Sequence, residues 1–373
     1  MKTHRQKTPA CLPLALGAFQ LLTSLACASA PNRSHEDDLV APSELPPAPA
    51  GSPVALHGQL RVEGALLKDQ TGLPIQLKGV SSMWLNWESR PFSRRRSALG
   101  FMRDNWKVSV IRAAMGTEVS GGYLNGNRAG MLESVETVIQ NAIVLGVYVL
   151  VDWHTEKAVD QQADAVAFFS ALAQKYGSFP NVIWEPYNEP RGYTWEQVKS
   201  YHEAVVDAIR AVDPDNLIVL GTPNWSQDVD AASLNPVNPA GGPANLLYAL
   251  HFYACTHGQG YRDKGNTAMA NGLALFVTEF GATPANGGTP PDNRVCRDEA
   301  NAWFDWMGTN NISGAAWKLD QCSDSSCILA ADAPAKGPWT DDFLTTDANN
   351  TPAPAGGTLG GGHGLFVVDW IRR

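Results

Sequence analysis

Two glutamates stand at the carboxyl ends of apolar segments in this sequence. Glu189 follows V-I-W-E-P-Y-N at residues 182–188, and Glu279 lies in F-V-T-E-F-G at residues 276–281. Two carboxyl groups that face one bond are what glycoside hydrolysis requires, one as proton donor and the other as nucleophile. Glu185, inside the first segment, we interpret instead as a partner in a buried ion pair.

Basic and hydrogen-bonding residues at the ends of other apolar segments have roles beside such a carboxyl pair. Arg112 would keep the carboxylate of Glu279 ionised by charge pairing. His251 and Tyr253 would form hydrogen bonds to the carboxyl groups and polarise them. These residue types therefore favour a site in which one carboxyl group is held charged and the other is not.

Further residues of this set would bind sugar. Asn188 would hold a 2-hydroxyl, an interaction that strengthens in the transition state of glycoside hydrolysis. Trp317 would offer a flat face to a pyranose ring. We expect Asp152 to orient His154 rather than to act as an acid. Two more tryptophans, Trp195 and Trp225, follow apolar segments, and contact with substrate is for both the alternative to a structural role.

These side chains need a fold that brings several strand ends to one place. Short apolar segments rich in β-branched residues recur at 75–82, 108–115, 147–154, 181–189, 217–222, 246–253, 274–281 and 314–319. Several of them are apolar almost throughout, which is typical of parallel strands covered on both faces. The pattern predicts a parallel sheet whose carboxyl ends carry the polar residues.

Helical patterns lie between many of these segments. Apolar residues from Met131 to Ile143 follow the i, i+3, i+4 spacing of a helix. A capping-box pattern at residues 194–197 opens a second helix, with these residues on one face: Val198, Tyr201, Val205 and Ile209. Eight strands alternating with helices predict the α/β class and a (β/α)₈ TIM barrel as a single catalytic domain, with a doubly wound open sheet as the alternative.

Six short motifs occur in order at these strand ends: V-I-R-A-A-M, V-D-W-H, N-E-P, A-L-H-F-Y, F-V-T-E-F-G and A-A-W. Together they resemble glycoside hydrolase family 5, in particular its bacterial endoglucanase (cellulase) subfamily, over residues 56–373. The resemblance implies a retaining double displacement and endo-cleavage of β-1,4-glucan without a metal or other cofactor. By motif match Glu189 would be the acid/base and Glu279 the nucleophile. The substrate-binding or supporting positions would be Arg112, His154, Asn188, His251, Tyr253, Trp317 and Trp87.

The sequence departs from that subfamily at one sugar subsite. After S-S the subfamily usually has a histidine that contacts sugar, and here Met83 stands there, although Trp87 matches the nearby stacking tryptophan. After the tryptophan of the last strand the family often has a lysine and a glutamate that bind the same sugar. Cys322 and Asp324 stand near those two positions. The resemblance therefore implies the same reaction with an altered neighbouring subsite.

The overall composition limits the classes of partner. The 373 residues carry a formal net charge of −9. A chain without a basic surplus is a poor ligand for phosphates, which argues against nucleic acid and against an anionic membrane surface. We expect a monomer that binds a β-1,4-glucan polysaccharide or oligosaccharide.

The N-terminal region predicts export. Basic residues within the first seven positions precede an apolar run at residues 12–26, which favours a signal peptide over residues 1–27. The sequence S-L-A-C that ends at Cys27 also resembles a bacterial lipoprotein box. The sequence therefore leaves two interpretations, a secreted protein and a cell-surface lipoprotein anchored at Cys27.

A linker is expected between the signal and the catalytic domain. Residues 28–55 are rich in Pro, Ala, Ser and acidic residues, a composition that favours a mobile tether. The catalytic domain would then span residues 56–373.

The four cysteines outside the predicted signal peptide are Cys255, Cys296, Cys322 and Cys327. An even number in an exported chain favours disulfides. We expect the pairs Cys255–Cys296 and Cys322–Cys327, with reduced buried thiols as the alternative. Zinc is disfavoured because the spacing lacks paired CxxC ligands.

Two other classes of function remain open from the residues. A metal hydrolase would have to assemble ligands from scattered histidines and acids, since neither HExxH nor HxH spacing occurs. A non-catalytic carbohydrate-binding barrel would keep the tryptophans but has no use for two opposed carboxylates. The expected function is a retaining endo-β-1,4-glucanase. Its nearest alternative is a retaining endo-hydrolase of mixed-linkage glucan, glucomannan or mannan, or xylan.

Overall fold

The computed structural model describes residues 37–373, except 89, 238–244, 290–291, 323, 331–332, 334–339 and 347–361. The strands that build its central sheet are β3 (Lys78–Ser82), β4 (Val110–Gly116), β5 (Tyr148–His154), β6 (Val182–Glu185), β7 (Leu217–Leu220), β8 (Leu246–Ala249), β9 (Phe252–Tyr253), β10 (Leu275–Gly281) and β11 (Ser313–Leu319).

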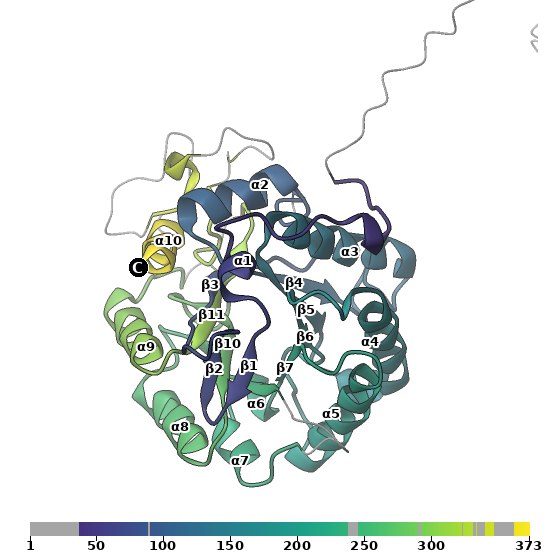
Figure 1. Cartoon of the computed structure of the whole chain (residues 1–373). Coiled ribbons are helices and arrows are strands. Elements are labelled where there is room, and N and C mark those ends of the chain that lie inside the picture. The colour runs from purple at the N-terminus through teal and green to yellow at the C-terminus, as the bar shows by residue number, and fades with distance from the viewer. Residues whose placement is uncertain are drawn as a thin grey trace, which may run out of the picture. The chain divides into compact units, whose positions relative to one another are not determined.

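These strands close into a barrel (Figure 1). Neighbours along the chain pair in parallel from β3 to β8, β10 pairs with β11, and β11 pairs again with β3. Both β8 and β9 pair with β10, so they form two halves of one barrel strand and the ring has eight members. The prediction of a (β/α)₈ barrel is confirmed, and the open sheet is excluded.

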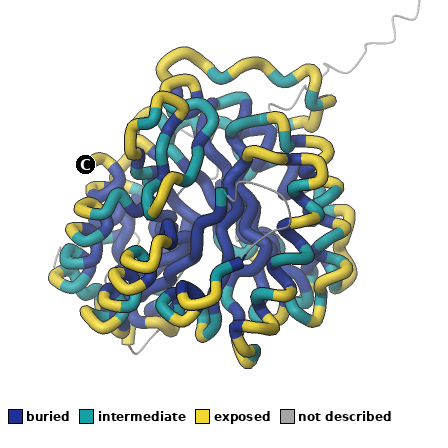
Figure 2. Tube along the Cα trace, turned by 60° about the horizontal axis from the view of Figure 1, so that its bottom comes forward, coloured by how far each residue is buried: buried dark blue, intermediate teal, exposed yellow. Residues whose placement is uncertain are grey.

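Helices surround the barrel in Figure 1. They are α2 (Arg96–Phe101) with a π-helical turn (Met102–Trp106), α3 (Arg128–Leu145), α4 (Gln162–Tyr176) after a 3₁₀ turn (Ala158–Gln161), α5 (Trp195–Arg210), α6 (Pro223–Ser226), α7 (Val229–Ser233), α8 (Gln259–Ala270), α9 (Arg297–Thr309) and α10 (Gly364–Arg372). Short 3₁₀ turns lie at Pro42–Glu44 and Asp341–Phe343. Figure 2 shows the buried strands inside a shell of partly exposed helices.

The two helices predicted from periodicity and capping are present. α3 buries its apolar positions from Met131 to Ile143. α5 begins after Thr194, whose side chain accepts a hydrogen bond from the backbone N–H of Gln197, as a capping box requires. The four apolar residues predicted to share one face of α5 are all buried. Both helices therefore cover the barrel with the faces that the sequence indicates.

One strand ends earlier than the sequence predicts. β6 stops at Glu185, because Pro186 has no N–H with which to continue the ladder. Asn188 and Glu189 follow in a loop, and their backbone N–H groups donate to carbonyl oxygens at and just beyond the end of β5. The loop is thus held at the carboxyl end of the barrel, where the two side chains were expected.

The amino-terminal end of the barrel is closed by a hairpin of β1 (Arg61–Glu63) and β2 (Leu66–Lys68). In Figure 1 this hairpin lies across the front of the barrel. Leu60 and Leu67 are buried there in one cluster with inward-facing strand residues, among them Val110 and Leu150. This end is a packed core, and the opposite end is left for a site.

Residues 37–55 pack on the domain, and the prediction of a mobile linker is wrong for them. Val40 and the side chain of Gln140 on α3 exchange two hydrogen bonds, of 3.0 and 2.8 Å. Asp37 accepts from Arg95 at 3.2 Å. Val54 is buried within α1 (Pro53–His57). These polar and apolar partners on the barrel stabilise a segment whose composition alone suggests disorder.

The predicted signal peptide and residues 28–36 of the predicted linker lie outside the described residues. Within the described part of the chain, the helices are too short or too polar to cross a bilayer. Both predicted disulfides are present. Cys255–Cys296 joins the loop after β9 to the residue before α9, and Cys322–Cys327 closes a loop after β11.

Candidate active site

The carboxyl groups of Glu189 and Glu279 meet at the carboxyl ends of the strands. One oxygen of each and one ring nitrogen of His251 lie within 4.8 Å of one another. Glu279 belongs to β10 and is 5% exposed, while the side chain of Glu189 is 18% exposed. Carboxyl groups about 5–5.5 Å apart suit direct attack by one of them on a sugar, whereas about 6.5–9.5 Å leaves room for an attacking water.

The surroundings of Glu189 favour its protonated form. Burial raises the pKa of Glu189 to about 8, and the positive charge of Arg112 opposes this shift. Neighbouring carboxylates raise it further, namely Glu156, Asp152 and Glu185. At neutral pH this carboxyl group therefore carries a proton that it can donate.

His251 connects Glu189 to the barrel wall. Its Nδ1 lies 3.0 Å from Oε1 of Glu189, and its Nε2 lies 2.8 Å from the hydroxyl of Thr278. Burial lowers the pKa of His251 to about 4, so the ring is neutral. When Nδ1 carries the single proton, it donates to Glu189 and Nε2 accepts from Thr278. Hydrogen bonding therefore accounts for both nitrogens, which disfavours the reading of this cluster as a metal site. The role of Thr278 was not expected from the sequence.

Each carboxylate oxygen of Glu279 has its own donor. The Nη1 of Arg112 lies 3.0 Å from Oε2, and the hydroxyl of Tyr253 donates to Oε1 at 2.6 Å. Burial raises the pKa of Tyr253 well above its ordinary value, so its hydroxyl keeps its proton. The carboxylate is thus fixed in position and paired with a cation.

Arg112 is fully buried and organises the floor of the site. Its Nε donates to Glu185 at 2.7 Å, and its Nη2 reaches Asp152 at 2.9 Å and Oδ1 of Asn188 at 2.6 Å. Burial opposes its charge, but the three carboxylates around it raise the pKa of Arg112 above its ordinary value. Glu185 is therefore the buried ion-pair partner that the sequence indicates. The bond to Oδ1 leaves the amide of Asn188 with its NH₂ group as a donor.

An aromatic wall stands beside the carboxyl pair. The rings of His154 and Trp317 stack, with centroids 5.4 Å apart and planes at 2°. Nδ1 of His154 lies 2.5 Å from Oδ2 of Asp152, which holds the ring as predicted. Burial lowers the pKa of His154 to about 3, so this ring is neutral.

Two adjoining pockets, of about 470 and 460 Å³, form one cleft across the barrel mouth. They share the lining residues Glu156, Glu189, Tyr253 and Glu279. One half, which we call the β7 half, is lined further by Asn224, Trp225, Gln227, His257 and Tyr261. The other, the β11 half, is lined by Trp84, His154, Asn188, Trp317, Lys318 and Asp324, among others. The carboxyl pair thus lies where the two halves meet.

Trp225 is held in the β7 half by an unusual backbone. Residues 224–226 all have positive φ, of 58°, 59° and 56°. This conformation costs roughly 1–3 kcal/mol per residue and is retained mainly at functional sites. The indole N–H donates to Glu156 at 3.1 Å, and the guanidinium of Arg191 lies 4.9 Å from the ring centroid. Trp195 instead packs beneath the surface, 7% exposed, and is not among the residues that line the cleft.

The predicted stacking tryptophan, Trp87, lies at the edge of the site. It is 46% exposed and stacks on Trp84, with centroids 4.9 Å apart. Trp84 lines the β11 half and contacts His154 edge-on, with ring centroids 4.3 Å apart, so it is the nearer ring, although the sequence did not indicate it. Met83 packs against the buried cluster that contains Trp317.

Comparisons with known proteins agree with this geometry. A family model described as cellulase (glycosyl hydrolase family 5) matches residues 68–323. The chain is 42% identical over 306 residues to an endoglucanase of Clostridium saccharobutylicum, covering 81% of this chain and 66% of that protein. It is 43% identical over 258 residues to endoglucanase Z of Dickeya dadantii, covering 68% of this chain and 58% of that protein. The chain thus spans less than two thirds of the length of either relative.

Among solved structures, the catalytic domain of a Thermobifida fusca endoglucanase in complex with cellotetraose is similar to this chain. The TM-score is 0.75 at 29% identity, and the match covers 87% of this chain and all of that one.

Proposed function

The chain belongs to glycosyl hydrolase family 5, the cellulase family, and we propose that it is a retaining endo-β-1,4-glucanase. The proposal depends above all on the carboxyl pair of Glu189 and Glu279, with oxygens within 4.8 Å, one group buried and protonated and the other paired with Arg112. The endoglucanase names of the relatives and the cellotetraose complex favour β-1,4-glucan as the substrate.

In the first displacement, the carboxylate of Glu279 attacks the anomeric carbon while Glu189 gives its proton to the glycosidic oxygen. The bond from that carbon to the leaving oxygen breaks, and a bond to Glu279 forms. Arg112 and Tyr253 hold the attacking carboxylate in place by the hydrogen bonds described above. The product is a shortened glucan and a glycosyl-enzyme.

In the second displacement, the now ionised Glu189 takes a proton from a water molecule. The water oxygen attacks the anomeric carbon and Glu279 leaves as a carboxylate, which restores the starting state. Two inversions at one carbon retain its configuration. His251 remains within hydrogen-bond distance of Glu189 and stabilises its charged form between the two steps.

The direction of the chain follows from the 2-hydroxyl. This hydroxyl belongs to the sugar that is attacked, and Asn188, the residue proposed to hold it, lines the β11 half. We therefore place the non-reducing part of the substrate in the β11 half, against Trp317. The departing chain lies in the β7 half, where Trp225 offers its ring.

Cellular location and oligomeric state are also proposals. We propose that residues 1–27 direct export, either as a secreted protein or as a lipoprotein anchored at Cys27, and that the chain acts as a monomer. The disulfides fit an oxidising compartment.

Substrate depolymerisation tests the proposal. Reducing-end release and viscosity loss would be measured on carboxymethylcellulose, barley β-glucan, glucomannan and xylan, with Glu279→Gln as the control. We expect a rapid loss of viscosity on the glucans that is abolished in the variant. Activity on mannan or xylan alone would show that the substrate is that glycan and not β-1,4-glucan. A folded protein that binds glucan equally well with and without Glu279→Gln, and hydrolyses nothing, would support a binding barrel instead.

A further inference from the structure

Two buried carboxyl groups in the barrel take no part in either displacement. Asp152 on β5 and Glu185 at the end of β6 are register partners in the parallel sheet, and both side chains are fully buried. Each gives one oxygen to the same guanidinium, Oδ2 of Asp152 to Nη2 of Arg112 at 2.9 Å and Oε2 of Glu185 to Nε at 2.7 Å. The other oxygens, Oδ1 of Asp152 and Oε1 of Glu185, have no hydrogen-bond donor among the described residues.

One cation faces three carboxyl groups here. Nη1 of Arg112 also binds Glu279 at 3.0 Å, so a single positive charge is shared among Asp152, Glu185 and Glu279. If all three carboxyl groups were ionised, the cluster would carry two excess negative charges in a buried place. Buried charges without a partner are strongly unfavourable, and like charges at short range repel each other. Uptake of one proton by the cluster relieves both effects.

Two histidines contact the pair but do not supply a second positive charge. Nδ1 of His154 lies 2.5 Å from Oδ2 of Asp152, and Nε2 of His251 lies 3.9 Å from Oε1 of Glu185. Burial lowers the pKa of both histidines, so both rings are neutral. Glu189, in the loop after β6, is a further carboxyl group and adds no positive charge either. The excess of negative charge is therefore met by a proton on one of the carboxyl groups.

The missing donors locate this proton on Asp152 and Glu185 rather than on Glu279. Both oxygens of Glu279 accept hydrogen bonds, from Arg112 and from Tyr253, which favours its anion. Asp152 and Glu185 each keep one oxygen without a donor, and such an oxygen bears less charge when its carboxyl group is protonated. Burial raises the pKa of both groups against the charge of Arg112, and the charge of Asp152 raises the pKa of Glu185 further. Ionisation of one group thus opposes ionisation of the other.

We propose that Asp152 and Glu185 hold one proton between them and act as a positioning pair that carries a single negative charge. In the glycosyl-enzyme Glu279 is an uncharged ester, and the one charge of the pair then balances Arg112. The floor of the site is therefore neutral at the stage where Glu189 must be ionised to act as a base. This role in the reaction rests on the proposed function, whereas the shared proton does not.

Proton release on unfolding counts the protons that the pair holds. At pH 6 the carboxyl groups of an unfolded chain are ionised, so unfolding releases every proton that a buried carboxyl group has kept. The release on unfolding in urea would be measured with a pH indicator in weakly buffered solution. Glu185→Gln replaces the proton by an amide and should release one proton fewer than the unmodified chain. Asp152→Asn should also release one proton fewer.

The double substitution separates a shared proton from two independent ones. Asp152→Asn combined with Glu185→Gln should again lower the release by one proton, because the pair holds only one. A decrease of two would show that each group carries its own proton, and no decrease in any variant would show that both are ionised. Either result would overturn the proposal. Glu203→Gln, at a half-exposed glutamate on α5, should leave the count unchanged, and circular dichroism would show that each variant is folded.

A pH profile tests the role of the pair in the reaction. With 2,4-dinitrophenyl β-cellobioside the activated leaving group makes hydrolysis of the glycosyl-enzyme the slow step, so kcat reports that step. Its acidic limb follows the ionisation of Glu189 in the glycosyl-enzyme. The double variant removes the last negative charge of the pair, so this limb should lie at lower pH than in Glu185→Gln alone. Coincident limbs would overturn the role in charge balance. Failure of the unmodified chain to hydrolyse any glucan, with the proton counts as expected, would overturn the proposed function and not the shared proton.

Discussion

Glu189 and Glu279 have the same side chain and different neighbours. Glu279 is paired with Arg112 and with the hydroxyl of Tyr253, both of which favour a fixed anion. Glu189 is hydrogen-bonded to neutral His251, and its pKa is raised by burial first and by the charges of nearby carboxylates second. Environments that keep one carboxyl group ionised and the other protonated make the first a nucleophile and the second an acid.

Replacement of Glu189 tests the role of the proton donor. Glu189→Gln cannot protonate the departing oxygen, so kcat on cello-oligosaccharides should fall by about 10²- to 10⁴-fold. From a dinitrophenyl cellobioside the dinitrophenolate anion departs without protonation, so the glycosylation step on this substrate should be largely spared. Burst kinetics on both substrates measure the difference. Glu203→Gln, a half-exposed glutamate on α5, should change neither. Equal losses on the two substrates would contradict the assignment.

The pH profile tests the cause of the raised pKa. Glu189 must be protonated in the first step, so kcat/KM should fall as the pH rises through its pKa of about 8. Glu156 contributes to that pKa by its negative charge. Glu156→Gln removes the charge, so the alkaline limb should move to lower pH. A limb that stays in place, or moves to higher pH, would show that this carboxylate does not act on Glu189.

Strands position the site through one buried cation. Arg112 on β4 binds Glu185 on β6 and Glu279 on β10, and it also reaches Asp152, the register partner of Glu185 on β5. One guanidinium therefore balances charges on or between four barrel strands. Arg112 thus stabilises the barrel as well as the charge of Glu279.

Loss of that cation should destabilise the barrel. Arg112→Met leaves three buried carboxylates without their partner, so the free energy of unfolding should fall by about 3–5 kcal/mol. Urea denaturation followed by tryptophan fluorescence measures this. Arg128→Met, which breaks an ion pair with 55% and 42% exposed side chains, should leave the midpoint nearly unchanged. Comparable effects of the two substitutions would contradict the proposed network.

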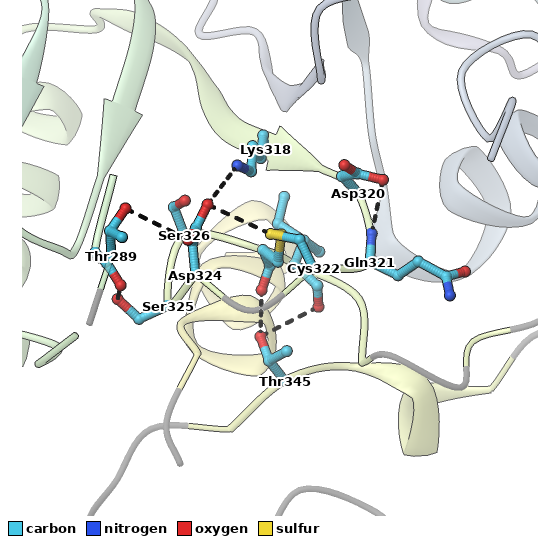
Figure 3. The surroundings of a disulfide bond; sticks show 12 residues. Thr289, Lys318, Asp320, Gln321, Cys322, Asp324, Ser325, Ser326 and Thr345 are labelled. Carbon is cyan, nitrogen blue, oxygen red and sulfur yellow. Dashed lines mark hydrogen bonds and ion pairs between the residues drawn. A yellow bond between two sulfur atoms is a disulfide. The ribbon is translucent and has the colours of Figure 1, made fainter. Parts of the chain in front are cut away.

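The strands and their polar ends are readable from the sequence because parallel buried strands are apolar and end abruptly. Asn188 and Glu189 are the exception, since Pro186 ends β6 before them and only tertiary hydrogen bonds to the end of β5 place them. Lys318 and Trp84 escaped prediction for a related reason. Each lies beside an expected site position, and each is placed in the cleft by side-chain contacts, of Trp84 with His154 and of Lys318 with Asp324 (Figure 3), that no local pattern reveals.

At the scale of the whole molecule, composition gave a wrong prediction for residues 37–55 and a correct one for the disulfides. Residues 37–55 look like a linker, but they bond to α3 and bury Val54. Their partners lie far along the chain, so no local pattern reveals them. The disulfides were easier to predict, because a chain with four cysteines outside its signal has few pairings.

The two disulfides should stabilise the domain unequally. Cys255–Cys296 spans 41 positions and Cys322–Cys327 spans 5. Loop-closure entropy then predicts losses of about 4 and about 2 kcal/mol in the free energy of unfolding when each pair is replaced by serines. Urea unfolding of the two double variants compares them. A larger loss from the short loop would contradict the entropic account, and four reactive thiols in the denatured mature chain would contradict both pairs.

Trapping of the covalent intermediate tests the central claim most directly. The chain would be incubated with 2,4-dinitrophenyl 2-deoxy-2-fluoro-β-cellobioside, digested, and searched by mass spectrometry for the labelled peptide. We predict one fluorocellobiosyl group, attached to Glu279. A label on Glu189 or Glu185, or hydrolysis with inverted configuration and no adduct, would contradict the mechanism.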